Sequence, residues 1–135
     1  MEIKEVPLEI IWQIRREVMY PDFDLEEVKL KDDELGKHLG LFVKNKLVSI
    51  ISIFIENKAL QFRKFATIKS EQGKGYGKQL LQYVFNLAKE NNCEFIWCNA
   101  RATALGLYEK FGMKPFGESW NTNGFDFVRM SIELI

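Results

Sequence analysis

The chain is poor in metal-binding residues, with only two cysteines and one histidine among 135 residues. Cys93 and Cys98 have a spacing that matches no zinc or redox pattern, and His38 alone cannot complete a metal site with them. We therefore expect no metal ion. Cys98 lies in an apolar stretch, which is typical of a buried strand residue. A lone histidine such as His38 is more often a surface or packed residue than a catalytic base.

Long apolar runs are also missing, and none approaches the ~18 residues that a membrane span needs. The first residues, MEIKEVPLEI, lack the apolar core of a signal peptide. Nineteen basic and nineteen acidic residues cancel, so the net charge favours neither nucleic acid nor a membrane as partner. We expect one cytoplasmic, globular domain over residues 1–135, long enough to bury a core.

The charge is uneven along the chain. From Asp22 to Glu34 there are seven acidic residues against two lysines, whereas from Arg63 to Lys78 there are five basic residues against Glu71. An acidic run is usually a solvated face, but this one is also a candidate to attract a cationic substrate. The basic run surrounds a glycine-rich loop, where an anionic ligand would benefit from it.

Hydrophobic periodicity predicts alternating strands and helices. Apolar spacing favours an amphipathic helix that Pro21 ends, and a longer one after the glycine-rich loop. The expected helices are 8–20, a short one near 25–30, 77–90 and 102–111, and Gly112 suits a helix C-terminus; the expected strands are 38–44, 47–56, 59–68, 93–99, 116–120 and 125–132. Tight turns are expected at Asn45-Lys46 and within 121–124.

The unit of strand 59–68, helix 77–90 and strand 93–99 should make its two strands parallel neighbours. The expected fold class is therefore α/β: a mixed, largely antiparallel sheet of about seven strands, with a central parallel βαβ unit and helices on both faces.

The most informative stretch is Gln72-Gly73-Lys74-Gly75-Tyr76-Gly77, between that strand and that helix. Its three glycines let the backbone approach a ligand closely and adopt positive φ. The helix N-terminus presents unpaired N–H groups and a partial positive charge, which suits a phosphate-bearing ligand. Lys74 and Lys78 are candidates to reach phosphate oxygens.

Two familiar glycine-loop motifs do not fit. A Walker A loop needs Gly where Gln72 stands and a Ser or Thr where Gln79 stands. The dinucleotide fingerprint Gly-x-Gly-x-x-Gly fails from Gly73, because its last position is Lys78, and from Gly75, because it is Leu80.

A third motif fits. Gln72-x-x-Gly75-x-Gly77 resembles the Arg/Gln-x-x-Gly-x-Gly/Ala motif of the GNAT superfamily of acyl-CoA-dependent N-acetyltransferases. The run 104–113, ALGLYEKFGM, is similar to the family's Ala-x-x-Leu-Tyr-Glu-Lys-x-Gly-Phe signature, and the order of elements agrees. The resemblance is specific over 60–115. One departure is Lys69, which stands where many relatives have proline.

The resemblance implies acetyl-CoA as co-substrate and a set of cofactor contacts. The pyrophosphate of coenzyme A would be held by main-chain N–H groups of the loop, and the pantetheine arm would pair with the strand before it. The implied cofactor-binding positions are Phe65, Ala66, Thr67, Gln72, Gly73, Lys74, Gly75, Tyr76, Gly77 and Lys78. Many relatives also have a cofactor-contacting Asn seven residues before the signature tyrosine; here that position is Arg101, with Asn99 nearby, and either is a candidate.

The resemblance also implies a catalytic role for Tyr108, which matches the tyrosine that protonates the departing thiolate in relatives. The alternative is a core aromatic, because Tyr108 shares a helix face with Ala104 and Phe111. Glu56 and Glu71 are possible bases, but neither is assigned.

The implied reaction is direct acetyl transfer to a primary amine, on a small molecule or a peptide, in a ternary complex without a covalent enzyme intermediate. The oligomeric state would be a monomer or homodimer. A non-catalytic acyl-CoA sensor and a nucleotide-binding protein are the alternative functions.

Overall fold

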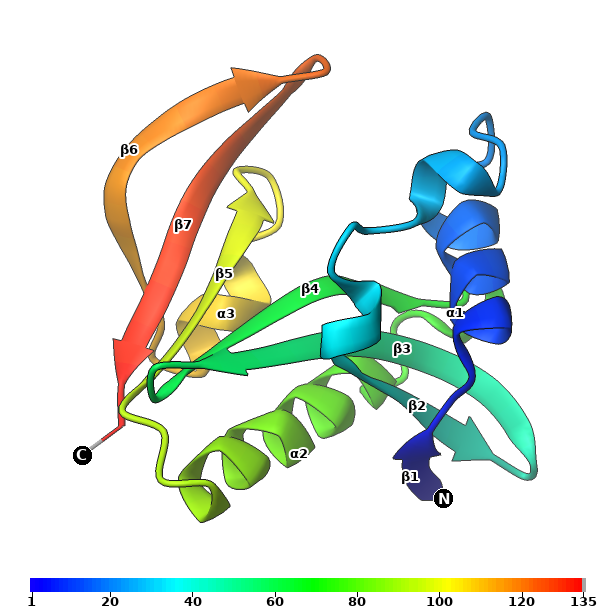
Figure 1. The fold of residues 1–135 in the computed structure, drawn as a ribbon, viewed down its shortest axis with the longest axis horizontal. Helices are drawn as coiled ribbons and strands as arrows, with labels where there is room; N and C mark the ends of the chain where they lie inside the picture. Colours follow the sequence, from blue (N-terminus) through cyan, green and yellow to red (C-terminus); the bar gives the residue numbers. More distant parts are fainter. Residues whose placement is uncertain (135) are drawn as a thin grey trace. The chain divides into compact units, whose positions relative to one another are not determined.

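The computed structural model describes residues 1–134, which form a seven-stranded sheet in the order β1-β2-β3-β4-β5-β7-β6 (Figure 1). The strands are β1 (Glu2–Glu5), β2 (Lys37–Val43), β3 (Lys46–Glu56), β4 (Ala59–Thr67), β5 (Phe95–Arg101), β6 (Lys114–Thr122) and β7 (Phe125–Glu133). β4 and β5 pair in parallel, whereas β1–β2, β2–β3, β5–β7 and β6–β7 pair antiparallel. The predicted α/β class, with a mixed sheet and a central parallel βαβ unit, is confirmed.

The helical segments are α1 (Leu8–Ile14), α2 (Tyr76–Glu90) and α3 (Gly106–Lys110), with a π-helical turn η1 (Arg15–Met19) and 3-10 turns η2 (Glu26–Val28), η3 (Asp33–Leu35) and η4 (Lys69–Glu71). The predicted helix 8–20 is thus present, but its second half is wound as a π-helix. Within residues 1–134, no helix is both long and apolar enough to span a membrane.

The chain forms two compact units that share β3, β4 and α2. The N-terminal unit comprises Met1–Phe54 and Lys64–Val84, and the C-terminal unit comprises Ile55–Arg63 and Phe85–Ile135. Each unit is described by itself below.

The N-terminal unit is organised by a small apolar cluster, formed by Val6, Ile11, Ile50 and Ala66. In the β2–β3 hairpin the two residues with positive φ are Lys44 (52°) and Asn45 (66°), so the turn lies one residue earlier than the predicted Asn45-Lys46. The reason is that Lys46 already pairs with Val43 in the sheet.

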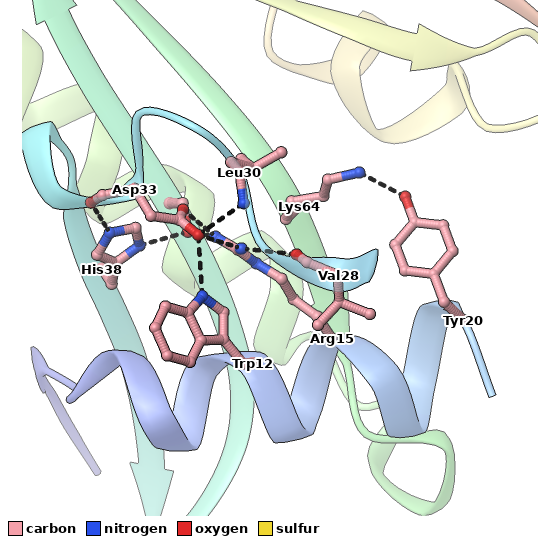
Figure 2. A network of polar contacts seen from close by, with 9 residues as sticks. Trp12, Arg15, Tyr20, Val28, Leu30, Asp33, His38 and Lys64 are labelled. Carbon is pink, nitrogen blue, oxygen red and sulfur yellow. Dashed lines mark hydrogen bonds and ion pairs between the residues drawn. The ribbon is translucent and has the colours of Figure 1, made fainter. Parts of the chain in front are cut away.

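A buried polar network joins α1 and η1 to the acidic segment (Figure 2). Arg15, which is fully buried, donates to both carboxylate oxygens of Asp33 at 2.9 and 2.8 Å and to the Val28 carbonyl at 3.0 Å. Asp33 also accepts from Trp12 Nε1 and the Leu30 amide, both at 2.9 Å. Asp33 is therefore a structural residue of the acidic segment. It is held by the charge of Arg15, which lies on an otherwise apolar helix face.

His38 completes this network and is buried, as a packed residue would be. Its Nε2 lies 2.7 Å from the Asp33 carbonyl oxygen, and its Nδ1 lies 2.7 Å from Ser52 Oγ. Because a carbonyl can only accept, Nε2 carries the proton and Nδ1 can accept from Ser52. The ring therefore has both nitrogens occupied by the fold.

The C-terminal unit contains the parallel pairing, with Ala59 opposite Phe95 and Gln61 opposite Trp97. Cys98 lies opposite Met130 on the buried face of β5 and β7, which confirms its prediction as a buried strand residue.

Three elements of the C-terminal unit, β5, α3 and β6, differ by two or more residues from their predicted bounds. β5 begins at Phe95 rather than at residue 93, because the Cys93 amide donates to the Ala88 carbonyl and closes α2. α3 begins at Gly106 rather than at 102, because the Ala102 amide is bonded to Asp126 instead. β6 runs from 114 to 122, longer than the predicted 116–120, since its pairing with β7 resumes after an irregularity between Phe116 and Trp120.

Candidate active site

In the N-terminal unit, the end of β4 is tied to β3 through side chains. Ser49 Oγ donates to the Ala66 carbonyl at 3.0 Å and lies 3.0 Å from Thr67 Oγ1. Gln72 Nε2 donates to the Thr67 carbonyl at 3.0 Å, so the first residue of the glycine motif folds the loop back onto the strand. This contact assigns Gln72 a structural task that needs no ligand.

The loop itself has the conformation that its glycines were expected to permit. Gly73 and Gly75 have φ of 81° and 84°, and a Cβ placed on either would meet no atom within 4 Å. The glycines are therefore required by backbone conformation, while the space beside them is open. An L-residue at either position would be strained whatever the space.

The main-chain amides of this loop have no hydrogen-bond acceptor within residues 1–134. Among the hydrogen bonds of residues 1–134, none is donated by an amide of residues 73–78; the first amide of α2 with a backbone partner is that of Gln79, which donates to Gly75. Unpaired amides at a helix N-terminus form an anion-binding arrangement.

Gly77 has a different role from the other two glycines. A Cβ at this position would lie 3.3 Å from Phe65 Cζ and 3.4 Å from Thr67 Oγ1. The first turn of α2 therefore packs closely against the end of β4. This contact brings the loop amides and residues 65–67, predicted as separate parts of one cofactor site, together within the same unit.

The two lysines of the loop differ in their surroundings. Lys74 Nζ lies 3.3 Å from both carboxylate oxygens of Glu71, whereas Lys78 makes no ion pair within residues 1–134. Glu71, one of the possible bases, is thus paired with a lysine.

In the C-terminal unit, Tyr108 lies on α3 with its ring 5.6 Å from that of Phe62. Burial raises the pKa of the Tyr108 hydroxyl, and the nearby Cys98 raises it further. Burial also raises the pKa of the Cys98 thiol to about 12, so both groups keep their protons near neutral pH. Tyr108 is therefore packed against an aromatic neighbour, and its hydroxyl is protonated near neutral pH.

Asn99 and Arg101, the two remaining candidates, point from β5 toward other side chains of the C-terminal unit. Asn99 Oδ1 accepts from Arg129 Nε at 3.4 Å, and the Arg101 guanidinium lies 4.1 Å from the centre of the Phe125 ring. Within residues 1–134, no group of three or more His, Cys, Asp or Glu side chains is arranged to hold a metal ion.

Comparison with known proteins identifies the family. Residues 16–134 match the family model described as an acetyltransferase (GNAT) domain. The chain is 30% identical over 133 residues to the Bacillus subtilis (strain 168) protein named "Uncharacterized N-acetyltransferase YitI". The aligned region covers 92% of this chain and 89% of that protein. The chain belongs to the GNAT acetyltransferase family.

Solved structures of GNAT proteins share its fold. The ribosomal-protein-S18-alanine N-acetyltransferase of Escherichia coli superposes with a TM-score of 0.82 at 17% identity, covering 98% of this chain and 92% of that one. A GNAT family acetyltransferase of Elizabethkingia anophelis, solved with acetyl-CoA bound, superposes with a TM-score of 0.78 at 18% identity, covering 98% and 97%. At these identities the likeness concerns the fold.

The sequence analysis missed two features of this GNAT domain. One is the buried network of Arg15, whose only sequence signal is a charged residue four positions after Ile11 on an apolar face. The other is a contact between Tyr20 and Lys64. These two residues lie far apart in the chain, and no local sequence pattern indicates that they are in contact.

Proposed function

We propose that this protein transfers an acetyl group from acetyl-CoA to a primary amine by direct attack in a ternary complex. The observation that supports it is the run of amides from Gly73 to Lys78, none of which the described chain uses for its own hydrogen bonds. Such amides can bind the oxygens of a diphosphate, and Lys78 adds a positive charge beside them.

Two observations support the residues proposed to hold the cofactor. Gly73 and Gly75 leave room beside the loop, and no carboxylate other than the lysine-paired Glu71 is found in the segment 68–78. Phe65, Ala66 and Thr67 would pair through their backbone with the pantetheine arm, and an N–H there would stabilise negative charge on the thioester oxygen. The remaining residues proposed to contact the cofactor are Lys74, Tyr76, Asn99 and Arg101.

Bound acetyl-CoA supplies the thioester. The neutral amine nitrogen attacks its carbonyl carbon, the carbon–sulfur bond breaks, and coenzyme A leaves as a thiolate. In this proposal Tyr108 gives its proton to the sulfur, and the nitrogen loses one proton, so charge and atoms balance. The base that accepts the proton from the nitrogen is not assigned. We infer that the protein acts in the cytoplasm as a monomer or homodimer, on a small-molecule or peptide amine.

The proposal is tested by ligand-dependent melting followed by turnover. Acetyl-CoA at about 100 times its dissociation constant should stabilise the protein by about 2.7 kcal/mol, which raises the melting temperature by several degrees. ATP with magnesium should not. Release of free thiol in the presence of an amine panel then measures transfer. Melting that responds to ATP and not to coenzyme A would overturn the proposal, and a response to coenzyme A without turnover would favour a sensor.

A further inference from the structure

Lys64 has an unusual backbone for its position. Seven non-glycine residues among 1–134 have positive φ; six lie in turns, and Lys64, with φ of 53°, lies inside the strand β4. Such a conformation is unfavourable for an L-residue and is typically retained where a site requires it. The backbone strain therefore indicates that residue 64 has a functional role.

The side chain of Lys64 reaches Tyr20, the residue that directly follows η1 (Figure 2). Its Nζ lies 2.5 Å from the Tyr20 hydroxyl oxygen and 4.6 Å from the ring centre. Tyr20 is fixed in turn by stacking on Phe23, with ring centres 4.8 Å apart. Both side chains are half-buried, so the ammonium group is held in place rather than freely solvated.

The positive charge of Lys64 has no carboxylate partner in the described part of the chain. Lys4, Lys29 and Lys74 each pair with a glutamate, but Lys64 forms no ion pair with a carboxylate within residues 1–134. Its ammonium group uses one donor on Tyr20, which leaves two. Because the Tyr20 oxygen accepts from Lys64, its own O–H is also left to donate. These donors match the two oxygens of a carboxylate.

We propose that Lys64 and Tyr20 form a binding site for the carboxylate of the acceptor, so that the substrate is a primary amine bearing a carboxylate. This inference rests on the proposed function, which assigns the thioester arm to Phe65, Ala66 and Thr67. Lys64 directly precedes those residues, and one strand residue spans only about 3.3 Å. In this proposal an anion held there anchors the acceptor beside the residues assigned to the thioester arm, so that its own amine is positioned for attack.

The acidic segment 22–34 is the competing candidate for selecting the acceptor, and it would select a cationic acceptor. Several of its carboxylates already have partners in the N-terminal unit. Asp33 binds Arg15, Glu26 binds Lys29 at 2.6 Å, and Asp24 and Glu27 each accept from the other's amide at 3.0 Å. The observations therefore favour an acceptor that has an anionic group besides its amine over an acceptor that has a second cationic group.

The test compares amino acids with the amines that lack their carboxylates, and with a diamine, as acceptors. Lys64→Met should lower kcat/KM for the carboxylated acceptors about tenfold or more, the range of a charge-assisted hydrogen bond, and change kcat/KM for the amines that lack a carboxylate by less than about twofold. Lys64→Arg should retain part of the preference, and Tyr20→Phe should lose less than Lys64→Met.

The matched control is Lys44→Met, because Lys44 also has positive φ (52°) but lies in the β2–β3 turn. Because the Lys44 side chain is exposed, this change should leave both the melting temperature and the acceptor preference close to those of the unaltered protein. An equal loss of kcat/KM for acceptors with and without a carboxylate, a preference for the diamine, or no acetylation of any carboxylated amine would each overturn the inference. In those cases a melting response to acetyl-CoA still supports the proposed function, and its absence rejects that function separately.

Discussion

At the scale of single residues, Tyr108 carries the most specific chemical prediction. Its raised pKa keeps the hydroxyl protonated through the neutral and mildly alkaline range. A thiol with a pKa of about 8.5 needs only modest help to leave, so Tyr108→Phe should lower kcat about ten- to a hundredfold without abolishing it. The KM for acetyl-CoA should change little, because the ring remains against Phe62. Steady-state kinetics measures both.

The control for this change is Tyr83→Phe, which removes an exposed hydroxyl from α2. It should leave kcat unaltered. If Tyr108→Phe turns over as fast as the unaltered protein, the tyrosine is a packing residue and another group protonates the thiolate.

Asp33 makes the stability of the protein sensitive to acid. Burial alone would raise its pKa, but the hydrogen bonds from Arg15, Leu30 and Trp12 and the charge of Arg15 outweigh burial and hold the pKa at about 2. The unfolded-state value is about 3.8. The folded state is thus favoured by ionised Asp33 above about pH 4, and this contribution, about 2 kcal/mol, is lost as the pH falls toward 2.

The change that tests this account is Asp33→Asn, which leaves the buried Arg15 charge uncompensated. It should lower the free energy of unfolding at pH 7 by about 3–5 kcal/mol and flatten its decline between pH 4 and 2. Denaturant titrations at several pH values give both quantities, with the exposed Asp22→Asn as control. A decline that keeps its full slope in the variant would assign the acid sensitivity to other carboxylates.

At the scale of elements, the glycine loop and the β6–β7 turn offer a matched pair of positions. Gly73 and Gly124 have φ of 81° and 82°, and a Cβ on either meets no atom within 4 Å. Alanine at either should therefore cost about 1 kcal/mol of stability from backbone strain. Only Gly73→Ala should also weaken acetyl-CoA binding, by about tenfold, because the altered backbone would displace the amides that are proposed to bind the diphosphate. Calorimetric titration separates the two, and equal affinities in both variants would contradict a phosphate-binding role for the loop.

Much of the element structure follows from local sequence signals. The stripe of apolar residues in α2 specifies a helix from within its own sequence, and the Asn-Gly pair at 123–124 specifies a turn in which both residues have positive φ. β1 was not predicted, because its four residues, Glu2–Glu5, are mostly charged and exposed and become a strand only by pairing with β2. The π-helical winding of η1 was not predicted either, since no local pattern distinguishes it from an α-helix.

The candidate site divides in the same way. The positions of Gly73, Gly75 and Gly77 in a loop before a helix follow from the motif alone. The contacts that surround them do not, because they join residues distant in sequence: Lys64 with Tyr20, and Gly77 with the end of β4. Tyr20 belongs to a predicted helix and Lys64 to a predicted strand, but neither of these local patterns indicates that the two residues are in contact.

At the scale of the whole molecule, the two compact units raise the question of how many domains the chain has. The boundaries between them fall at 54/55, 63/64 and 84/85, inside β3, β4 and α2. Domain boundaries normally fall in linkers with few crossing contacts, not in the middle of strands and helices. We therefore propose that residues 1–135 unfold as one cooperative domain.

This proposal predicts coincident transitions from probes placed in each unit. Trp12 reports on the N-terminal unit, and Trp97 and Trp120 report on the C-terminal one. Variants that keep only Trp12 or only Trp120 should give the same denaturation midpoint once each is corrected for its own stability by far-UV circular dichroism, and the calorimetric and van't Hoff enthalpies should agree. Fluorescence of Trp120 that changes before the helical signal would instead show that the C-terminal unit opens independently. Breaking a unit boundary inside α2 would require rupture of its continuous helix, and for that reason we expect the single transition.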